Sequence, residues 1–165
     1  MTPPRPDEAV PPAGVLIVDD EAMVATALES FLQLETSYRV HAFTRPAQAL
    51  EALESERVHV IIADFMMPGM DGITFLTRAR EMRPQAARIL LTGYADKESA
   101  IRAINDVGLY QYLEKPWDNE QLKLVIRNGV ERATLFDELD RHVGALESAN
   151  SELVEIRRRI TRAFL

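Results

Sequence analysis

Three aspartates stand where two apolar runs of the sequence stop. Asp19 and Asp20 follow residues 15–18, and Asp64 follows residues 58–63. Carboxylates gathered within several ångströms repel one another by about 4 kcal/mol per close pair at an effective dielectric near 20, so a cation is expected among them. Oxygen ligands with room for water and phosphate oxygens suit Mg²⁺ better than a transition metal. The pattern therefore predicts a Mg²⁺ site.

Two more polar side chains end later apolar runs. Thr92 follows residues 88–91 and offers a hydroxyl, and Lys115 comes shortly after Tyr112 and offers a positive charge that can bind phosphate. With Asp64 as nucleophile, and with metal and Lys115 neutralising the developing charge, the set predicts phosphoryl transfer to a carboxylate. Each residue also has a plainer explanation: a turn cap for Asp64, strand propensity for Thr92 and a solvated charge for Lys115.

The elements that must bring these residues together follow from the hydrophobic pattern. Strands are predicted at 15–18, 38–43, 58–63, 88–91 and 109–113, and helices at 22–34, 47–53, 73–82, 96–105 and from about Asp118 onward, with Asp118 as N-cap. This alternation predicts a doubly wound α/β domain, because parallel strands need crossover connections, which are right-handed. In a flavodoxin-like five-stranded parallel sheet of order 2-1-3-4-5, the polar strand ends converge.

Five short segments at these strand ends resemble the receiver domain of two-component response regulators. They are Asp19-Asp20, Asp64, Met67-Pro68-Gly69-Met70-Asp71-Gly72, Leu91-Thr92-Gly93 and Tyr112-Leu113-Glu114-Lys115-Pro116. The resemblance implies that Asp64 is the phosphoacceptor. It also implies that Asp19, Asp20, Asp64 and the backbone carbonyl of Met66 hold Mg²⁺.

The resemblance extends to the residues around the phosphoryl group. Lys115 resembles the lysine that contacts the phosphoryl group and precedes a cis peptide bond to Pro116. Thr92 and Tyr112 resemble the switch pair, in which the hydroxyl turns toward the phosphate and the aromatic ring moves inward. Bulky Met66 and Tyr94 flank the route of an attacking water, so we expect the aspartyl phosphate to hydrolyse slowly.

Beyond the predicted domain the helical pattern continues with a heptad repeat. Leu139, Leu146, Leu153 and Ile160 recur every seven residues, which is typical of a coiled-coil seam. Two registers share this row. Its partner positions are either Leu135, His142, Ala149 and Ile156, or Phe136, Val143 and Asn150, after which Arg157 interrupts the second register. We predict a parallel dimer through residues 134–163; the alternative is an amphipathic helix that folds back on its own receiver.

Bulk properties narrow the class of protein. The chain has 165 residues, a formal charge of −7 and no cysteine, which excludes disulfides and argues against a nucleic-acid surface spread over the whole chain. No apolar run reaches the length of a membrane span, and no signal peptide is visible, so a cytoplasmic protein is expected. The predicted organisation is a disordered Pro-rich leader at 1–13, a receiver domain at 14–132 and a coiled-coil extension at 133–165.

The sequence thus predicts a receiver that accepts a phosphoryl group from a histidine kinase or a phosphotransfer protein and signals through a dimeric helix. No DNA-binding module follows the receiver, and a missing output domain is one explanation of the pattern that stops at Leu165. One alternative is a Mg²⁺-dependent aspartyl-phosphate phosphatase of the haloacid-dehalogenase type, which needs an acid where Met66 stands. Another is an interaction module that is never phosphorylated.

Overall fold

The computed structural model describes residues 10–164, apart from the side chains of Tyr94 and Val107. Within this part of the chain the elements are β1 (Gly14–Val18), α1 (Ala22–Glu35), β2 (Arg39–Phe43), α2 (Pro46–Ser55), β3 (Val60–Asp64), α3 (Gly72–Met82), β4 (Ala87–Thr92), the 3₁₀ helix η1 (Tyr94–Asp96), α4 (Lys97–Val107), β5 (Gln111–Glu114) and α5 (Asn119–Ala163). Residues 1–9 of the predicted leader lie outside the described residues.

The described strands form one parallel sheet in the order β2-β1-β3-β4-β5. Ile62 of β3 lies between Ile17 of β1 and Ile89 of β4 in this register. The side chains of β1, β3 and β4 are buried along their whole lengths, as the uninterrupted apolar runs indicate for strands covered on both faces. The predicted doubly wound fold is confirmed.

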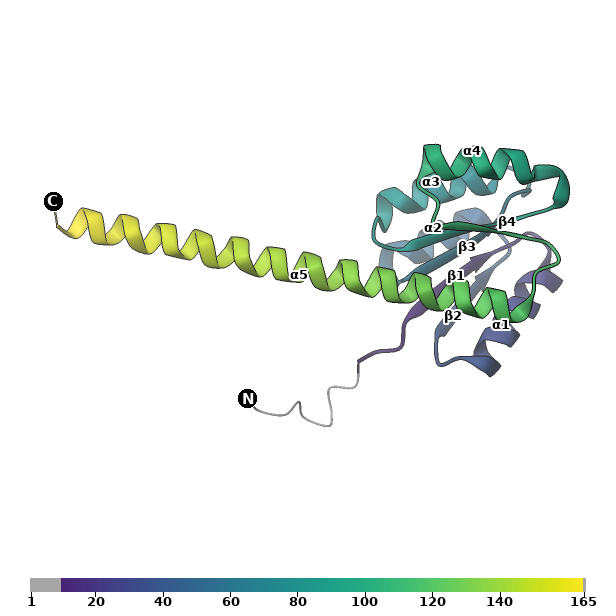
Figure 1. The fold of residues 1–165 in the computed structure, drawn as a ribbon, viewed down its shortest axis with the longest axis horizontal. Coiled ribbons are helices and arrows are strands. Elements are labelled where there is room, and N and C mark those ends of the chain that lie inside the picture. The colour runs from purple at the N-terminus through teal and green to yellow at the C-terminus, as the bar shows by residue number, and fades with distance from the viewer. Residues whose placement is uncertain (1–9, 165) are drawn as a thin grey trace. The chain divides into compact units, whose positions relative to one another are not determined.

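Two hydrophobic cores lie on opposite faces of the sheet. On one face α2, α3 and α4 contribute residues such as Leu53, Phe75 and Ala100. On the other, α1 and the first turns of α5 contribute residues such as Leu28 and Ile126 (Figure 1). Each fully buried aliphatic side chain stabilises the fold by about 1.5–3 kcal/mol relative to leaving it exposed, so the sheet is held rigidly between the helical layers.

Short connections and caps set the ends of the elements. The Asp118 carboxylate accepts a hydrogen bond from the N–H of Gln121 at 2.9 Å, which confirms the predicted N-cap of α5. After α4, Gly108 has a left-handed conformation (φ 67°), which favours glycine. Regular β5 pairing begins only at Gln111, two residues later than predicted, because the chain leaves that turn through Leu109 and Tyr110.

The chain divides into two compact units, Met1–Ala133 and Thr134–Leu165. In the second unit α5 is helical to Ala163, so the predicted long C-terminal helix is confirmed. Its apolar side chains are exposed at Leu135, Phe136, Leu139, Val143, Leu146, Leu153, Val154, Ile156 and Ile160. None of the helices in residues 10–164 combines the length and the apolar character that a membrane crossing requires.

Candidate functional site

The acidic residues meet at the carboxyl edge of the sheet. Asp19 follows β1 directly and Asp64 is the last residue of the neighbouring strand β3. Carboxylate oxygens of Asp19, Asp20 and Asp64 lie within 4.8 Å of one another. Asp19 and Asp64 are buried, whereas Asp20 is exposed. The parallel topology therefore brings together the three acids that the sequence singled out.

Lys115, which follows β5, lies between two of these acids. Its Nζ is 3.0 Å from Oδ2 of Asp19 and 3.1 Å from Oδ1 of Asp64. The other oxygen of Asp19 accepts a hydrogen bond from the backbone N–H of Glu21 at 2.9 Å, which fixes the rotation of that carboxylate. Both carboxylates are almost removed from water, and the Lys115 side chain is 23% exposed. Lys115 thus makes charge-assisted contacts with both carboxylates at once, and we call the group of Lys115, Asp19 and Asp64 the clamp.

Burial and ion pairing shift the pKa values of Asp64 and Lys115 in opposite directions. Burial raises the pKa of Asp64; the hydrogen bond from Lys115 lowers this pKa, and the neighbouring Asp19 and Asp20 raise it further, so the net shift is upward. Burial lowers the pKa of Lys115, but its hydrogen bonds to Asp19 and Asp64 outweigh that effect, so its pKa lies above the ordinary lysine value. Lys115 thus stays charged at neutral pH, and ionised Asp64 carries a free-energy cost.

The donor set of the cluster fits a hard divalent cation. All three side chains offer carboxylate oxygens, and one ammonium group, that of Lys115, pairs with them in the described residues. An all-oxygen site with surplus negative charge and one exposed member suits Mg²⁺ or Ca²⁺ better than a thiophilic metal. The arrangement is consistent with the metal site of a receiver domain.

Thr92 lies on β4, the strand beside that of Asp64, and Tyr112 lies on β5, one strand further along the sheet. Thr92 ends β4, one residue beyond Leu91, the register partner of Asp64. It is fully buried, and its hydroxyl donates a long hydrogen bond of 3.5 Å to the carbonyl of Leu113. Tyr112 on β5 is half-buried and packs against the core beneath α4. Both residues therefore belong to the part of the sheet that flanks the acids.

The segments that follow β3, β4 and β5 hold the remaining residues of the predicted site. Met66 is 63% exposed, while the side chain of Tyr94 lies outside the described residues. The peptide bond between Lys115 and Pro116 is cis, as the resemblance implies.

Gly72 is a residue of this site that stands out in the sequence only as the end of a segment resembling the receiver domain. A Cβ there would overlap the backbone carbonyl oxygen of Asp64 and would lie 2.8 Å from Cδ1 of Leu90. The only sequence signal was the glycine itself, placed eight residues after Asp64. Gly72 lets the start of α3 approach the end of β3, and so helps to fix the backbone of Asp64.

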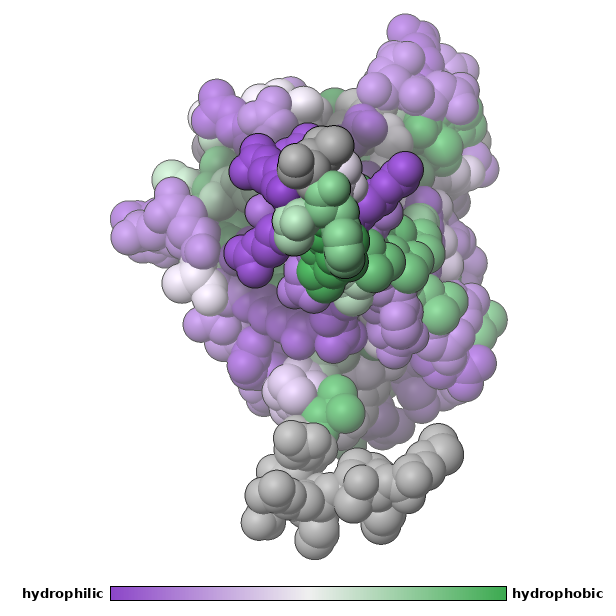
Figure 2. All heavy atoms as spheres, turned by 90° about the vertical axis from the view of Figure 1, so that its left-hand side faces the viewer, coloured by the Kyte–Doolittle hydropathy of each residue, from purple (hydrophilic) through white to green (hydrophobic). Residues whose placement is uncertain are grey.

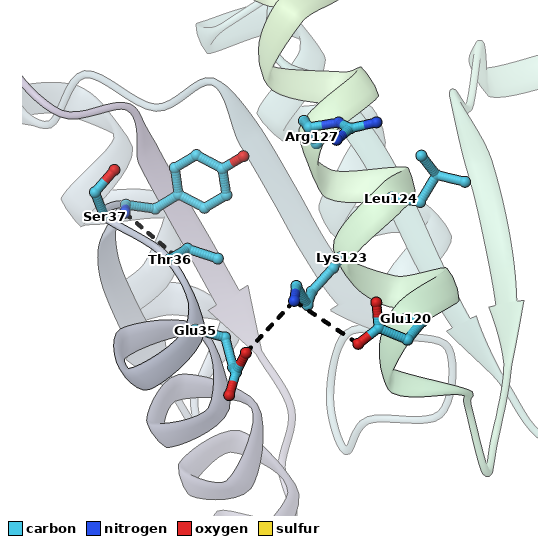
Figure 3. A pocket seen from close by; sticks show the side chains of 8 residues that line it. Glu35, Thr36, Ser37, Glu120, Lys123, Leu124 and Arg127 are labelled. Carbon is cyan, nitrogen blue, oxygen red and sulfur yellow. Dashed lines mark hydrogen bonds and ion pairs between the residues drawn. The ribbon is translucent and has the colours of Figure 1, made fainter.

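A second lysine lies between two carboxylates elsewhere in the first unit. Lys123 of α5 is 3.4 Å from Glu35 and 3.7 Å from Glu120, at a hollow of about 650 Å³ (Figure 3). Here the glutamate side chains are 51% and 85% exposed. Lys123 thus lies between two carboxylates that are exposed to solvent, whereas Lys115 lies between two that are buried, so the two lysines can be compared.

A doubly wound parallel sheet with a lysine-clamped acidic cluster at its carboxyl edge defines the receiver class of domain. The family model described as response regulator receiver domain matches residues 15–127, so the chain belongs to that family. Residues 15–127 are accordingly a signalling module of the receiver type, and receiver domains partner with histidine kinases.

Known proteins and structures resemble this region over most of its length. The hydrogenase transcriptional regulatory protein HoxA of Cupriavidus necator is 38% identical over 129 residues, which are 78% of this chain and 26% of that protein. The signal receiver domain of an HD domain-containing protein from Pseudomonas fluorescens Pf-5 has a TM-score of 0.70 and 35% identity, over 75% of this chain and 98% of that chain.

A further solved structure, an adenylate cyclase from Rhodopirellula baltica, matches with a TM-score of 0.75 and 26% identity, over 80% of this chain and 97% of that chain. The chain spans about a quarter of the length of the first curated relatives that it matches. Those relatives are larger regulators that contain segments beyond this region.

Proposed function

We propose that residues 14–132 form a phosphoacceptor domain in which Asp64 receives a phosphoryl group from a histidine kinase or a phosphotransfer protein. The observation that carries the proposal is the position of Lys115 Nζ, 3.0 Å from Asp19 and 3.1 Å from Asp64, beside a third carboxylate. A buried acid with a cation held against it and an open, exposed neighbour is suited to take up a group that brings more negative charge.

The proposed reaction uses the chain's own groups in distinct roles. An oxygen of Asp64 forms a bond to phosphorus while the phosphorus–nitrogen bond of a phosphohistidine breaks, and the donor imidazole leaves with the electron pair and takes up a proton. Lys115 neutralises charge on the transferred oxygens. Mg²⁺ held by Asp19, Asp20, Asp64 and the carbonyl of Met66 would supply further neutralisation of the phosphoryl oxygens.

We propose that Thr92 and Tyr112 report the change. The 3.5 Å hydrogen bond from Thr92 to the carbonyl of Leu113 is at the outer limit of hydrogen-bond length, so little free energy is lost when the hydroxyl turns toward a phosphoryl oxygen. The ring of Tyr112, which is half-buried against the core, then moves inward. In this proposal the signal leaves through a parallel dimer of the helix formed by residues 134–163.

The test uses acetyl phosphate with Mg²⁺ and measures the added phosphoryl group by intact-protein mass spectrometry. Wild-type protein is expected to gain one group, and Asp64→Asn to gain none. The matched control is Asp71→Asn in the same loop: Asp71 caps α3 by accepting from the N–H of Thr74 at 2.7 Å, and asparagine caps equally well. Asp71→Asn should label like wild type.

Each of the other outcomes would support a different phosphoacceptor or a different function. Labelling of Asp64→Asn would move the phosphoacceptor to another residue. No labelling of wild type by acetyl phosphate, together with no structural response to beryllofluoride and Mg²⁺, would favour an interaction module that is never phosphorylated. Sustained turnover of a free phosphoester would favour the phosphatase reading, which already lacks the acid it needs at Met66.

Slow loss of the phosphoryl group is part of the proposal. Exposed Met66 stands two residues beyond Asp64, where its side chain can hinder an attacking water. Radiolabelled phosphoprotein in Mg²⁺ buffer should therefore persist for minutes or longer, and replacing Met66 by alanine should speed its decay. Decay of the wild-type label within seconds would overturn this part of the proposal.

A further inference from the structure

The exposed apolar residues of the C-terminal helix do not follow one register from end to end. The row of Leu139, Leu146, Leu153 and Ile160 runs straight through. On one side of the row the helix offers Phe136 and Val143, and then polar Asn150 and Arg157. On the other side it offers apolar Leu135, then polar His142, and then Ala149, Ile156 and Ala163. Figure 2, which views the helix from its C-terminal end, shows the apolar side chains gathered on one side of it.

A coiled-coil seam made only of apolar residues must therefore pass from one side of the row Leu139, Leu146, Leu153 and Ile160 to the other. It runs through Phe136, Leu139, Val143, Leu146, Ala149, Leu153, Ile156, Ile160 and Ala163. The spacing alternates between three and four residues, as in a coiled coil, except at one place: Leu146 is three residues from both Val143 and Ala149. Such a three-residue insertion into the heptad pattern overwinds a coiled coil locally.

Starting from the dimer proposed above, on which this step rests, we propose that two parallel copies pair through this stepped seam, with the register change between Leu146 and Leu153. An unbroken register through Asn150 would bury the Arg157 guanidinium at the next core position, at a high desolvation cost. The other unbroken register would bury His142 and leave Phe136 and Val143 outside. The stepped seam keeps all three polar side chains at its margins.

Polar side chains beside the stepped seam are complementary between two parallel copies: one pair can form a hydrogen bond and the other an ion pair. In parallel coiled coils a residue flanking the seam faces the flanking residue five positions later on the other copy. Before the step this relation sets His142 against Glu147 of the second copy. After the step it sets Glu152 against Arg157 of the second copy. The unbroken register through Asn150 would place no charged pair at the later position, since its flanking residues there are Ala149, Val154, Ile156 and Thr161.

A second copy of this chain is therefore the occupant that the exposed face fits. In a parallel pair the step falls at the same height in both helices, so the overwound turn of one copy meets the overwound turn of the other. An unrelated helix would need the same irregularity at the same place.

Disulfide trapping in the full chain tests the register, because the sequence has no cysteine of its own. Single cysteines are placed at Leu139 and Ile160 in the row, at Val143 and Asn150 on one side, and at His142 and Ala149 on the other. Cross-linking is expected at Leu139 and Ile160, which requires parallel helices. It is also expected at Val143 and Ala149, and at least about tenfold more slowly at Asn150 and His142, which lie outside the seam.

Equal cross-linking at Val143 and Asn150, or at His142 and Ala149, would overturn the stepped register while leaving the dimer intact. Cross-linking near Leu146 and Leu153 but not at Leu139 and Ile160 would indicate antiparallel helices and would also overturn it. A monomer in sedimentation equilibrium at micromolar concentration would overturn the proposed dimer itself, as expected for a helix that packs on its own receiver.

A substitution gives a second, independent readout. Asn150→Leu places leucine outside the stepped seam, so the dimer dissociation constant should change by less than about threefold. In an unbroken register the same change would bury two leucines and tighten the dimer by at least about tenfold. The matched variant Ala149→Asn should weaken the dimer, because it puts a polar side chain into the stepped seam.

Discussion

Replacing Lys115 by methionine isolates the electrostatic contribution of the clamp. Methionine keeps most of the apolar stem and removes the charge that lies 3.0 Å from Asp19 and 3.1 Å from Asp64. At an effective dielectric near 20, each attraction is worth about 5 kcal/mol before desolvation is counted. Removing one partner of a buried pair leaves an uncompensated charge and typically costs about 3–5 kcal/mol. We expect Lys115→Met to lose about 3 kcal/mol of stability at pH 7.

The control is Lys123→Met, because the two lysines are nearly matched. Lys123 is 30% exposed, against 23% for Lys115, and also lies within 4 Å of two carboxylates. Its partners are solvated, so its loss should cost less than about 1 kcal/mol. Urea unfolding without divalent cations, followed by the fluorescence of Trp117, the single tryptophan, measures both variants. The thermal midpoint of Lys115→Met should fall by about 10 °C.

The pH dependence of the stability lost in Lys115→Met tests whether the loss is electrostatic. Lys115 lowers the pKa of Asp64, so without it that pKa rises further above its unfolded value. A carboxyl group with a raised folded-state pKa binds a proton more readily when folded, so stability is gained as pH falls through that pKa and lost as pH rises. The deficit of Lys115→Met should therefore shrink toward pH 4. A deficit equal to that of Lys123→Met, or one independent of pH, would refute the electrostatic account.

Three further predictions concern single side chains. Asp64→Asn should be more stable than wild type at neutral pH, because burial raises the pKa of Asp64 above its ordinary value of 3.8 and ionised Asp64 therefore destabilises the folded state. The difference in stability should vanish below pH 3.8. Urea midpoints across pH 3–8 check this, and a difference that is constant in pH would contradict it. Gly72→Ala should cost about 1–3 kcal/mol by the same assay, since its Cβ meets the Asp64 carbonyl and Leu90; a neutral result would mean that α3 shifts freely. Gly144→Ala, with nothing within 4 Å of the added Cβ, should stabilise the helix by about 1 kcal/mol per chain, which circular dichroism checks as a higher melting temperature of the helical signal; an unchanged melting temperature would contradict it.

The sheet and the acidic cluster were predictable because several independent signals agreed. Each of β1, β3 and β4 is an apolar run buried on both faces, which only a parallel sheet between two helical layers provides. Once the strand order is 2-1-3-4-5, adjacency of β1 and β3 forces Asp19 and Asp64 together. Topology, rather than any local feature of either residue, gave the site its geometry.

Other features depend on packing that no periodicity reveals. Arg88 lies in the buried strand β4, and its guanidinium donates to the carbonyls of Pro84, Ala86 and Gly108. Burial lowers its pKa, as do the nearby charges of Arg80 and Arg132. From the sequence alone, an arginine at the start of a strand is expected to be exposed to solvent. The close approach at Gly72 was hidden for the same reason, since it depends on the distance between two elements.

The charge balance of the site links its stability to its ligands. Among the described residues, three carboxylates share one ammonium group, so the folded domain retains surplus negative charge at this edge of the sheet. A site whose acids were all matched by fixed cations would have no electrostatic reason to bind another. A ligand that binds only the folded state stabilises it by about 2.7 kcal/mol at a hundred times its dissociation constant, which is comparable to the expected contribution of Lys115. Divalent cation should therefore stabilise Lys115→Met more than wild type, because the ammonium group that repels the ion is gone, and so reduce its deficit, whereas the Lys123→Met deficit should stay unchanged, since Lys123 lies outside the acidic cluster.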